Sequence, residues 1–204
     1  MNIKAVVFDY GQVISLPQDP TAIDRMAKMA CVERGKFEPV LLTLRNEYDR
    51  GTVSSREYYR KVLDKLSVDA DMNLIDEMIE TDFDSWKNIN PETVALMEDV
   101  KKAGYTLGIL SNMPHEFLAW ARKTLPVFSL PQVGLFSCEV NLLKPEQAIY
   151  RKLLSMLGAK DEEVVFFDDI VENITGARSL GINAFLWKDA ENARRELLSL
   201  GVKL

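Results

Sequence analysis

The sequence predicts an α/β protein: a doubly wound parallel sheet with a helical bundle inserted after its first strand. Three observations support this prediction. Short runs of branched apolar residues recur along the chain, as in buried parallel strands. From residue 91 onward these runs alternate with helical patterns, which is typical of a sheet covered by helices on both faces. Between about residues 20 and 88 the apolar residues instead repeat at three- and four-residue steps, without any strand pattern.

The composition is that of an ordinary globular protein. The 204 residues suffice for one sizeable core, or for a core domain with a small insertion. A net charge of −6 without a basic patch argues against nucleic acid as a partner. No apolar stretch approaches the roughly 18 residues of a membrane span, and the beginning of the chain lacks the layout of a signal peptide.

Cellular location is predicted from the same features. The two cysteines, Cys31 and Cys138, lack the spacing of metal ligands and are typical of free thiols in a reducing compartment. We therefore expect a cytoplasmic protein that binds neither membranes nor nucleic acid. No sequence pattern predicts an oligomeric state.

The first strand is expected over residues 3–8, because this run is short, branched and apolar. Glycine and prolines within 10–20 then indicate a turn. The helical block that follows extends from about 16 to 88. The chain is thus divided into an α/β core domain, residues 1–15 and 89–204, and an inserted helical domain, residues 16–88.

Four amphipathic helices are expected in the inserted domain, which suggests a small bundle. Breaks between them are predicted at Gly35, at 51–52 and around 67–71. Either Ser54 or Ser55 is the expected N-cap of the third helix, because a serine hydroxyl can accept a hydrogen bond from the first turn.

Strands and helices alternate in the second half of the chain. Asn90 is expected to cap a helix that starts at Pro91 and stops at Gly104. The other expected helices are 114–123, 145–157, 170–180 and 190–200, and the expected strands are 105–110, 164–167, 182–187 and a short one within 134–140.

Carboxylates close two of the predicted strands. Asp9 follows the first apolar run, and Asp168 and Asp169 follow the run that starts at residue 164. A buried carboxylate is costly unless something compensates its charge, and a metal ion is one candidate. We therefore expect the two strands to lie side by side and to bring the three aspartates together.

Other polar residues occupy comparable positions. Ser111 and Asn112 follow a strand, and Lys144 precedes a helix. In open parallel sheets, ligands bind beyond the carboxyl ends of the strands. These residues and the three aspartates therefore define one candidate site.

This set resembles the four motifs of the haloacid dehalogenase (HAD) superfamily, in order and in spacing. Asp9 lies in FDYGQV, Ser111 in LGILSN, Lys144 in LLKPEQAIY, and Asp168-Asp169 in FFDDIVENITGARSLGI. The inserted helical domain resembles the family's cap. The DxGxV form of the first motif and the cap sequence YDRG are similar to a subgroup that includes sugar-phosphate phosphatases.

The resemblance implies a phosphatase mechanism. Asp9 would attack phosphorus and form an aspartyl-phosphate. Lys144 would add a fixed positive charge and orient Asp9. The Ser111 hydroxyl and backbone N–H groups around Asn112 would hold the phosphoryl oxygens. Asn173, one helical turn after the acidic pair, would brace the acidic loop.

The resemblance also implies Mg²⁺ as the cofactor, since the expected ligands are all oxygens. These ligands are the Asp9 carboxylate, the backbone carbonyl of Gly11, and Asp169, with Asp168 binding either directly or through water. The ion would bridge Asp9 and a phosphate oxygen and so reduce the repulsion between them.

One departure from the family pattern lies at Gly11, where most HAD phosphatases carry an aspartate that acts as general acid and base. Such a group contributes about 10²–10⁴-fold to a reaction rate. Three explanations stay open. The leaving group is easy to expel, as in a sugar 1-phosphate; another residue, such as His115, supplies the proton; or the activity has been lost.

The favoured function is a Mg²⁺-dependent phosphatase acting on a small phosphorylated metabolite, with sugar phosphates as candidates. One alternative is a non-catalytic protein that binds phosphate or metal. Another is a 2-haloacid dehalogenase, which uses the same nucleophile against carbon without metal but lacks the paired acids of the fourth motif. In the cap, Arg45 and Arg50 are candidates for substrate contact, whereas Tyr48, Tyr58, Tyr59 and Trp86 are expected to pack the bundle.

Overall fold

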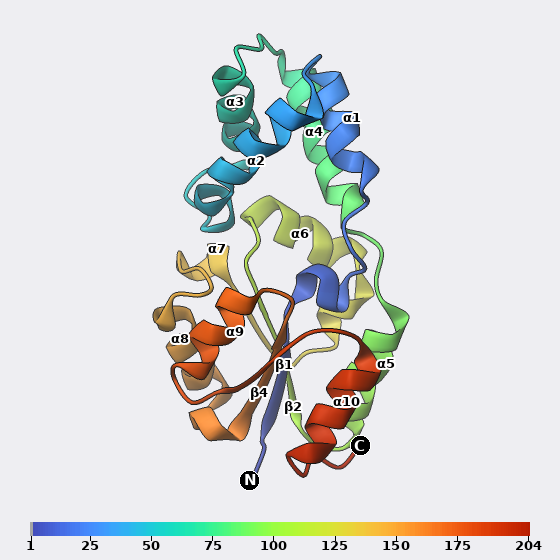
Figure 1. Ribbon diagram of the computed structural model, residues 1–204, viewed down its shortest axis with the longest axis vertical. Helices are drawn as coiled ribbons and strands as arrows, with labels where there is room; N and C mark the ends of the chain where they lie inside the picture. The colour runs from blue at the N-terminus through green and yellow to red at the C-terminus, as the bar shows by residue number, and fades with distance from the viewer. Residues whose placement is uncertain (1) are drawn as a thin grey trace.

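The structure, a computed structural model, describes residues 2–204 and contains one five-stranded sheet. All neighbouring strands pair in parallel, in the order β3-β2-β1-β4-β5. The strands are β1 (Ala5–Phe8), β2 (Thr106–Ser111), β3 (Val133–Phe136), β4 (Val164–Asp168) and β5 (Asn183–Leu186). The first strand of the chain therefore lies in the centre, between β2 and β4 (Figure 1). The predicted doubly wound parallel sheet is confirmed.

Helices cover both faces of the sheet (Figure 1). One face carries α5 (Pro91–Lys102), α6 (His115–Thr124) and α10 (Ala190–Ser199), and the other carries α8 (Gln147–Leu157) and α9 (Val171–Arg178). The side chains of β1 alternate between the two cores: Val6 and Phe8 belong to the first, and Ala5 and Val7 to the second. Both faces of β1 are buried, which explains its unbroken apolar sequence.

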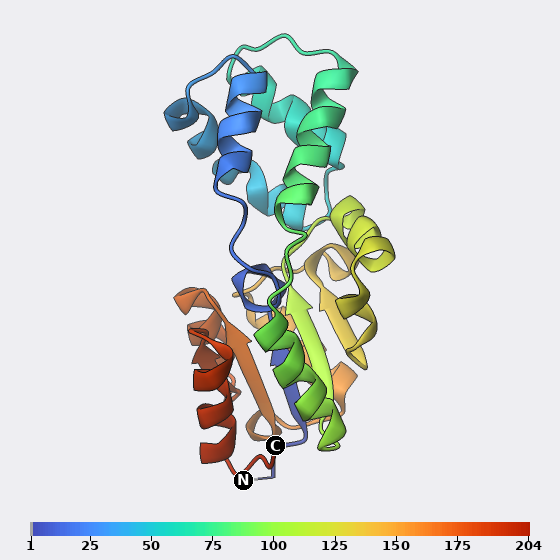
Figure 2. The ribbon, with the colours of Figure 1, turned by 90° about the vertical axis from the view of Figure 1, so that its right-hand side faces the viewer.

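A bundle of four helices stands beyond the carboxyl ends of the strands (Figure 2). Its helices are α1 (Thr21–Met29), α2 (Arg34–Asp49), α3 (Ser55–Lys65) and α4 (Met72–Ser85). The bundle has a hydrophobic core of its own, in which Met26, Phe37, Tyr59 and Leu63 are fully buried. We call these four helices and the segments between them the cap.

Two linkers that lie side by side connect the cap to the sheet. Ser15 and Ile89 form an antiparallel bridge, and the Leu16 N–H donates to the Asn88 carbonyl over 2.7 Å. The linkers therefore form a short hydrogen-bonded ribbon rather than two independent hinges.

Local signals in the sequence correctly place several helix ends. The Ser54 side chain accepts from the Glu57 N–H and forms a capping box at the start of α3. The Asn90 side chain accepts from the Glu92 N–H, and Pro91 is the first residue of α5. These predictions are confirmed because each depends on residues only a few positions apart.

The short strand expected within 134–140 is β3, which ends at Phe136. The residues after it form the short helix α7 (Ser137–Val140), where Ser137 bonds with Met113 and with the cap residue Asp49. The break expected at Gly35 is instead part of the first turn of α2. A glycine costs only about 1 kcal/mol in a helix, and burial of Phe37 and Leu41 on the same helix outweighs that cost.

Three short helical turns lie between the main elements: η1 (Tyr10–Ile14), η2 (Pro126–Ser129) and η3 (Asp161–Glu163). The helix expected from residue 145 begins two positions later, at Gln147, because Glu146 has extended backbone. Within residues 2–204, no helix combines the length and apolar character that crossing a membrane would require.

Candidate active site

Three carboxylates meet at the carboxyl ends of β1 and β4. The two strands pair in parallel with Phe8 opposite Phe167, so the residues that follow them reach the same edge of the sheet. One oxygen from each of Asp9, Asp168 and Asp169 lies within 4.8 Å of the others. The structure therefore brings together the three aspartates that the sequence placed at strand ends.

Lys144 lies between two of these carboxylates. Its Nζ is 2.8 Å from Asp9 Oδ1 and 2.6 Å from Asp168 Oδ2, and it also donates to the Leu110 carbonyl over 3.2 Å. The lysine side chain is 1% exposed, so water hardly screens these interactions. The position fits the expected role of fixing Asp9.

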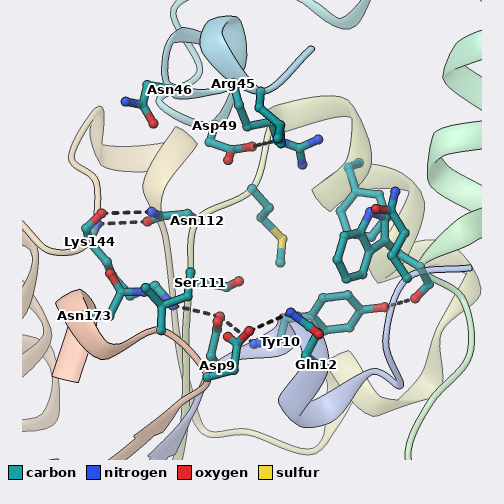
Figure 3. Close-up of a pocket in the computed structure, with 18 of the residues that line it drawn as sticks. Asp9, Tyr10, Gln12, Arg45, Asn46, Asp49, Ser111, Asn112, Lys144 and Asn173 are labelled. Carbon is teal, nitrogen blue, oxygen red and sulfur yellow. Dashed lines mark hydrogen bonds and ion pairs between the residues drawn. The ribbon is translucent and has the colours of Figure 1, made fainter. Parts of the chain in front are cut away.

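Asn112 holds the backbone of Lys144. The Lys144 N–H donates to Asn112 Oδ1 over 2.9 Å, and Asn112 Nδ2 donates back to the Lys144 carbonyl over 3.1 Å. Figure 3 shows this pair at the side of the site. The Asn112 side chain is thus engaged in positioning the lysine, a role that its place in the sequence did not reveal.

The Asp168 carboxylate accepts hydrogen bonds from three residues. Besides Lys144, it accepts from Asn173 Nδ2 at 2.9 and 3.1 Å and from the Ile170 N–H at 2.8 Å. It is fully buried and does not line the cavity above the site, whereas Asp9 and Asp169 do. The bracing role expected of Asn173 therefore acts on Asp168.

The turn after β1 supplies a further contact. Gln12 has a left-handed backbone with φ of 57°, and its Nε2 donates to Asp169 Oδ2 over 2.7 Å. Gln12 is not among the site residues predicted from the sequence, because no local pattern indicates that a residue of this turn reaches a carboxylate 157 positions away. The Asp9 carboxylate meanwhile accepts from the Tyr10 N–H over 2.7 Å.

The electrostatics of the cluster favour an additional cation. Burial raises the pKa of Asp9 above its usual range, and Lys144 only partly offsets this. Burial and the neighbouring Asp168 likewise raise the pKa of Asp169. Burial would lower the pKa of Lys144, but the two carboxylates beside it raise it, so the lysine stays charged. Among the described residues, three carboxylates thus share the charge of one lysine.

A hard divalent cation fits this donor set. All the candidate ligands are oxygens, which suits Mg²⁺ better than zinc. Asp9 and Asp169 offer carboxylate oxygens that line the cavity, and Gly11 lies beside them. Asp168 is already held by three donors and is therefore better suited to position the other groups or to act through a water molecule.

A cavity of about 450 Å³ separates this cluster from the cap. Figure 3 shows Arg45, Asn46 and Asp49 on its cap side, with Asp9, Gln12 and Ser111 on the opposite side. Its other cap residues are Ile23, Leu41, Leu42, Tyr58 and Asp82. The sequence pointed to Asp49 only as part of the cap sequence YDRG and did not point to Asp82, because charged residues on a small bundle usually face solvent.

The expected cap contacts divide into two groups. Arg45 lines the cavity, whereas Arg50 pairs with Glu146 at the junction between cap and core. Tyr58 and Trp86, expected only to pack the bundle, also line the cavity. Tyr48 and Tyr59 are fully buried in the cap core, as expected.

His115 is not placed to replace the missing acid. It is exposed at the start of α6 and lies against Gly51 of the cap, and it is not among the residues that line the cavity. Gly11 itself has an ordinary φ of −62°. A Cβ atom there would lie 3.7 Å from the Trp86 ring, an ordinary van der Waals contact. The backbone and space at Gly11 are therefore compatible with a side chain.

Two curated proteins are similar in sequence to this chain. Bifunctional epoxide hydrolase 2 of Sus scrofa is 27% identical over 221 residues, which cover 100% of this chain and 40% of the pig protein. Phosphatase MT3486 of Mycobacterium tuberculosis is 29% identical over 136 residues, covering 63% of this chain and 62% of that protein. The chain thus spans less than two thirds of these relatives.

Solved structures share the fold. The HAD family enzyme bt-2542 of Bacteroides thetaiotaomicron, in complex with magnesium and inorganic phosphate, superposes with a TM-score of 0.75. It is 20% identical, and the match covers 92% of this chain and 96% of that one. The family model for haloacid dehalogenase-like hydrolases matches residues 3–181. The chain therefore belongs to the haloacid dehalogenase-like hydrolase family.

Proposed function

We propose that the protein is a Mg²⁺-dependent phosphatase that hydrolyses a small phosphate monoester through Asp9. The observation that carries this proposal is the bridging position of Lys144, between Asp9 and Asp168 and below a capped cavity. A buried carboxylate held by a fixed cation is an oriented nucleophile.

The residues of the site divide the work of the reaction. Asp9 attacks phosphorus, and Lys144 holds its carboxylate in place. The Ser111 hydroxyl, which lies close enough to favour the charged form of Asp9, binds a phosphoryl oxygen. When bound between Asp9, the Gly11 carbonyl and Asp169, Mg²⁺ would neutralise charge on the phosphoryl group. The cap restricts the size of the substrate and the access of water.

The comparisons support this assignment without deciding the substrate. One relative is named a phosphatase, and one enzyme of the same fold was solved with magnesium and inorganic phosphate. Sugar phosphates are the substrates we would test first, because the sequence resembles a subgroup that includes sugar-phosphate phosphatases. The cytoplasmic location stays a prediction.

Asp169 argues against the dehalogenase alternative. A 2-haloacid carries its own carboxylate, and Asp169 adds a negative charge at the cavity wall beside Asp9. Without a cation, two like charges in a cavity of low dielectric repel each other. A phosphate that arrives with Mg²⁺ does not meet this repulsion.

The test is phosphate release from a panel of sugar 1-phosphates and sugar 6-phosphates. We expect turnover with Mg²⁺, no turnover with EDTA, and none in Asp9→Asn. Asp64→Asn, an exposed carboxylate on α3, is the matched control and should leave turnover unchanged. Turnover that survives EDTA or Asp9→Asn contradicts the proposal. Thermal stabilisation by phosphate ligands without any phosphate release indicates the non-catalytic alternative.

A further inference from the structure

The missing acid at Gly11 raises the question of which group protonates the leaving oxygen. Among residues 2–204, the carboxylic acids that line the cavity are Asp9, Asp49, Asp82, Asp169 and Glu172. Asp9 and Asp169 belong to the cluster around Lys144. Glu172 is exposed in the first turn of α9. The cap thus supplies the two remaining candidates, Asp49 and Asp82.

Of these two, Asp82 is the more deeply buried. It is 4% exposed, and it accepts from Gln18 Nε2 over 3.3 Å while Arg45 lies 3.7 Å away. Asp49 is more open to the cavity, with a side chain 13% exposed, and its Oδ1 accepts from Arg45 Nε over 2.8 Å. Figure 3 shows the Asp49 carboxylate facing the side of the cavity that carries Ser111 and Asp9.

The backbone of Asp49 is fixed to the core, although the residue belongs to the cap. Its carbonyl accepts from the Ser137 hydroxyl, and the same hydroxyl accepts from the Met113 N–H over 2.9 Å. Met113 follows the Ser111-Asn112 pair directly. One serine therefore ties Asp49 to the segment that carries the phosphate-binding groups.

The next two residues strengthen this attachment. Arg50 pairs with Glu146 and donates to the Asn141 carbonyl over 2.9 Å, and Asn141 Nδ2 donates back to the Arg50 carbonyl over 3.0 Å. Gly51 approaches the core so closely that a Cβ atom would lie 2.9 Å from Cys138 Cα. The end of α2 is thus held to the core by several contacts.

The surroundings of Asp49 suit a carboxyl group that changes its protonation state. Burial raises its pKa, and Asp82 on α4 acts in the same direction. Arg45 on its own helix and Lys144 in the core oppose this shift. Tyr58 of α3 also lines the cavity. Burial raises the pKa of its phenol above the usual value, so the side chain stays neutral.

We propose that Asp49 is the general acid and base of the phosphatase reaction, in place of the side chain that Gly11 lacks; this rests on the proposed function. In the first step the bond between Asp9 Oδ and phosphorus forms, the bond from phosphorus to the leaving oxygen breaks, and the Asp49 proton passes to that oxygen. In the second step Asp49 takes a proton from water, whose oxygen bonds to phosphorus as the bond to Asp9 breaks. Asp9 is thereby regenerated as a carboxylate and Asp49 as a carboxylic acid.

The dependence on the leaving group tests this role. Alkyl phosphates need a proton on the departing oxygen, whereas p-nitrophenyl phosphate expels a stable anion without one. We expect Asp49→Asn to lower kcat/KM for an alkyl phosphate by about 10²–10⁴-fold and to lower that for p-nitrophenyl phosphate far less. Asp49→Asn keeps an oxygen that can accept from Arg45, and Asp64→Asn is the control without effect on either substrate. An equal loss on both substrates, or no loss, contradicts the inference.

A second variant tests whether a proton donor is what Asp49→Asn removes. Gly11→Asp introduces a carboxyl where the backbone and the Trp86 ring leave room, and in the Asp49→Asn background it should recover alkyl phosphate turnover. A double variant no more active than Asp49→Asn counts against the inference. A wild-type protein that releases phosphate from neither substrate contradicts the proposed function itself, whereas an active protein insensitive to Asp49→Asn contradicts only this inference.

Discussion

The Lys144 ammonium lies between two buried carboxylates, those of Asp9 and Asp168. Removing its charge leaves both buried carboxylates without a cationic partner, a change that typically costs about 3–5 kcal/mol. We expect Lys144→Met to lower the free energy of unfolding by about that amount, measured by urea denaturation without Mg²⁺. Lys152→Met, at an exposed position on α8, is the control.

Two further measurements separate this charge effect from lost packing. Saturating Mg²⁺ should restore part of the stability of Lys144→Met, because it supplies positive charge to the same carboxylates. Replacing Asp168 by Asn in the Lys144→Met background should also recover stability, because one unpaired charge disappears. If the double variant is less stable than the single one, the charge explanation is wrong.

Gly51, at the turn after α2, tests how closely the cap approaches the core. Its φ is +78°, and a Cβ atom would lie 2.7 Å from His115 Nε2 and 2.9 Å from Cys138 Cα. Gly104 has a similar φ of +88° but nothing within 4 Å. Alanine at Gly104 should therefore cost roughly 1–2 kcal/mol for the left-handed backbone alone. Gly51→Ala should cost clearly more in thermal or urea unfolding, and equal costs would refute the close approach.

Glu146 connects α8 to the cap through Arg50, and this contact should depend on pH. The hydrogen bond from Arg50 lowers the pKa of Glu146 below its ordinary value of 4.5. The folded state therefore gains stability from the ionised carboxylate above pH 4.5 and loses it as the pH falls through the lower, folded-state pKa. We expect Glu146→Gln to lower the thermal midpoint at neutral pH, and the difference from wild type to vanish in acid. A difference that is constant with pH would contradict the ion pair.

What the sequence could predict follows from how far apart the interacting residues are. Ser54 and Asn90 cap helices through neighbours two or three positions away, so their roles could be read locally. Asp9 and Asp168 could be placed together because parallel strands end at one edge of the sheet. The sequence alone thus assigned all four motifs to one site.

The parts that could not be predicted depend on contacts between distant segments. Gln12, which has a left-handed backbone, donates to Asp169, a residue 157 positions away. Residues 137–140 are helical where they meet the end of α2, a contact that no local pattern reveals. His115 lies next to the second motif in sequence, yet the start of α6 carries it to the cap junction and out of the cavity.

Mg²⁺ binding should raise the thermal stability of cap and core together, because the cavity lies between cap and sheet. Binding to the folded state alone raises stability, by about 2.7 kcal/mol at a concentration 100 times the Kd. We expect Mg²⁺ to raise the thermal midpoint of the wild type, and Asp169→Asn to abolish most of this shift. Asp161→Asn, at a half-buried position of η3 at the opposite end of β4 from the site, should keep it. An equal shift in all three proteins would place the ion elsewhere.

Trapping the phosphorylated enzyme tests the central assignment most directly. Borohydride converts an aspartyl-phosphate into homoserine, which mass spectrometry locates in a peptide. During turnover of p-nitrophenyl phosphate with Mg²⁺, we expect homoserine at position 9 in the wild type and none in Asp9→Asn. Phosphate release without modification at position 9, or modification at another aspartate, would contradict the assignment of Asp9 as the nucleophile.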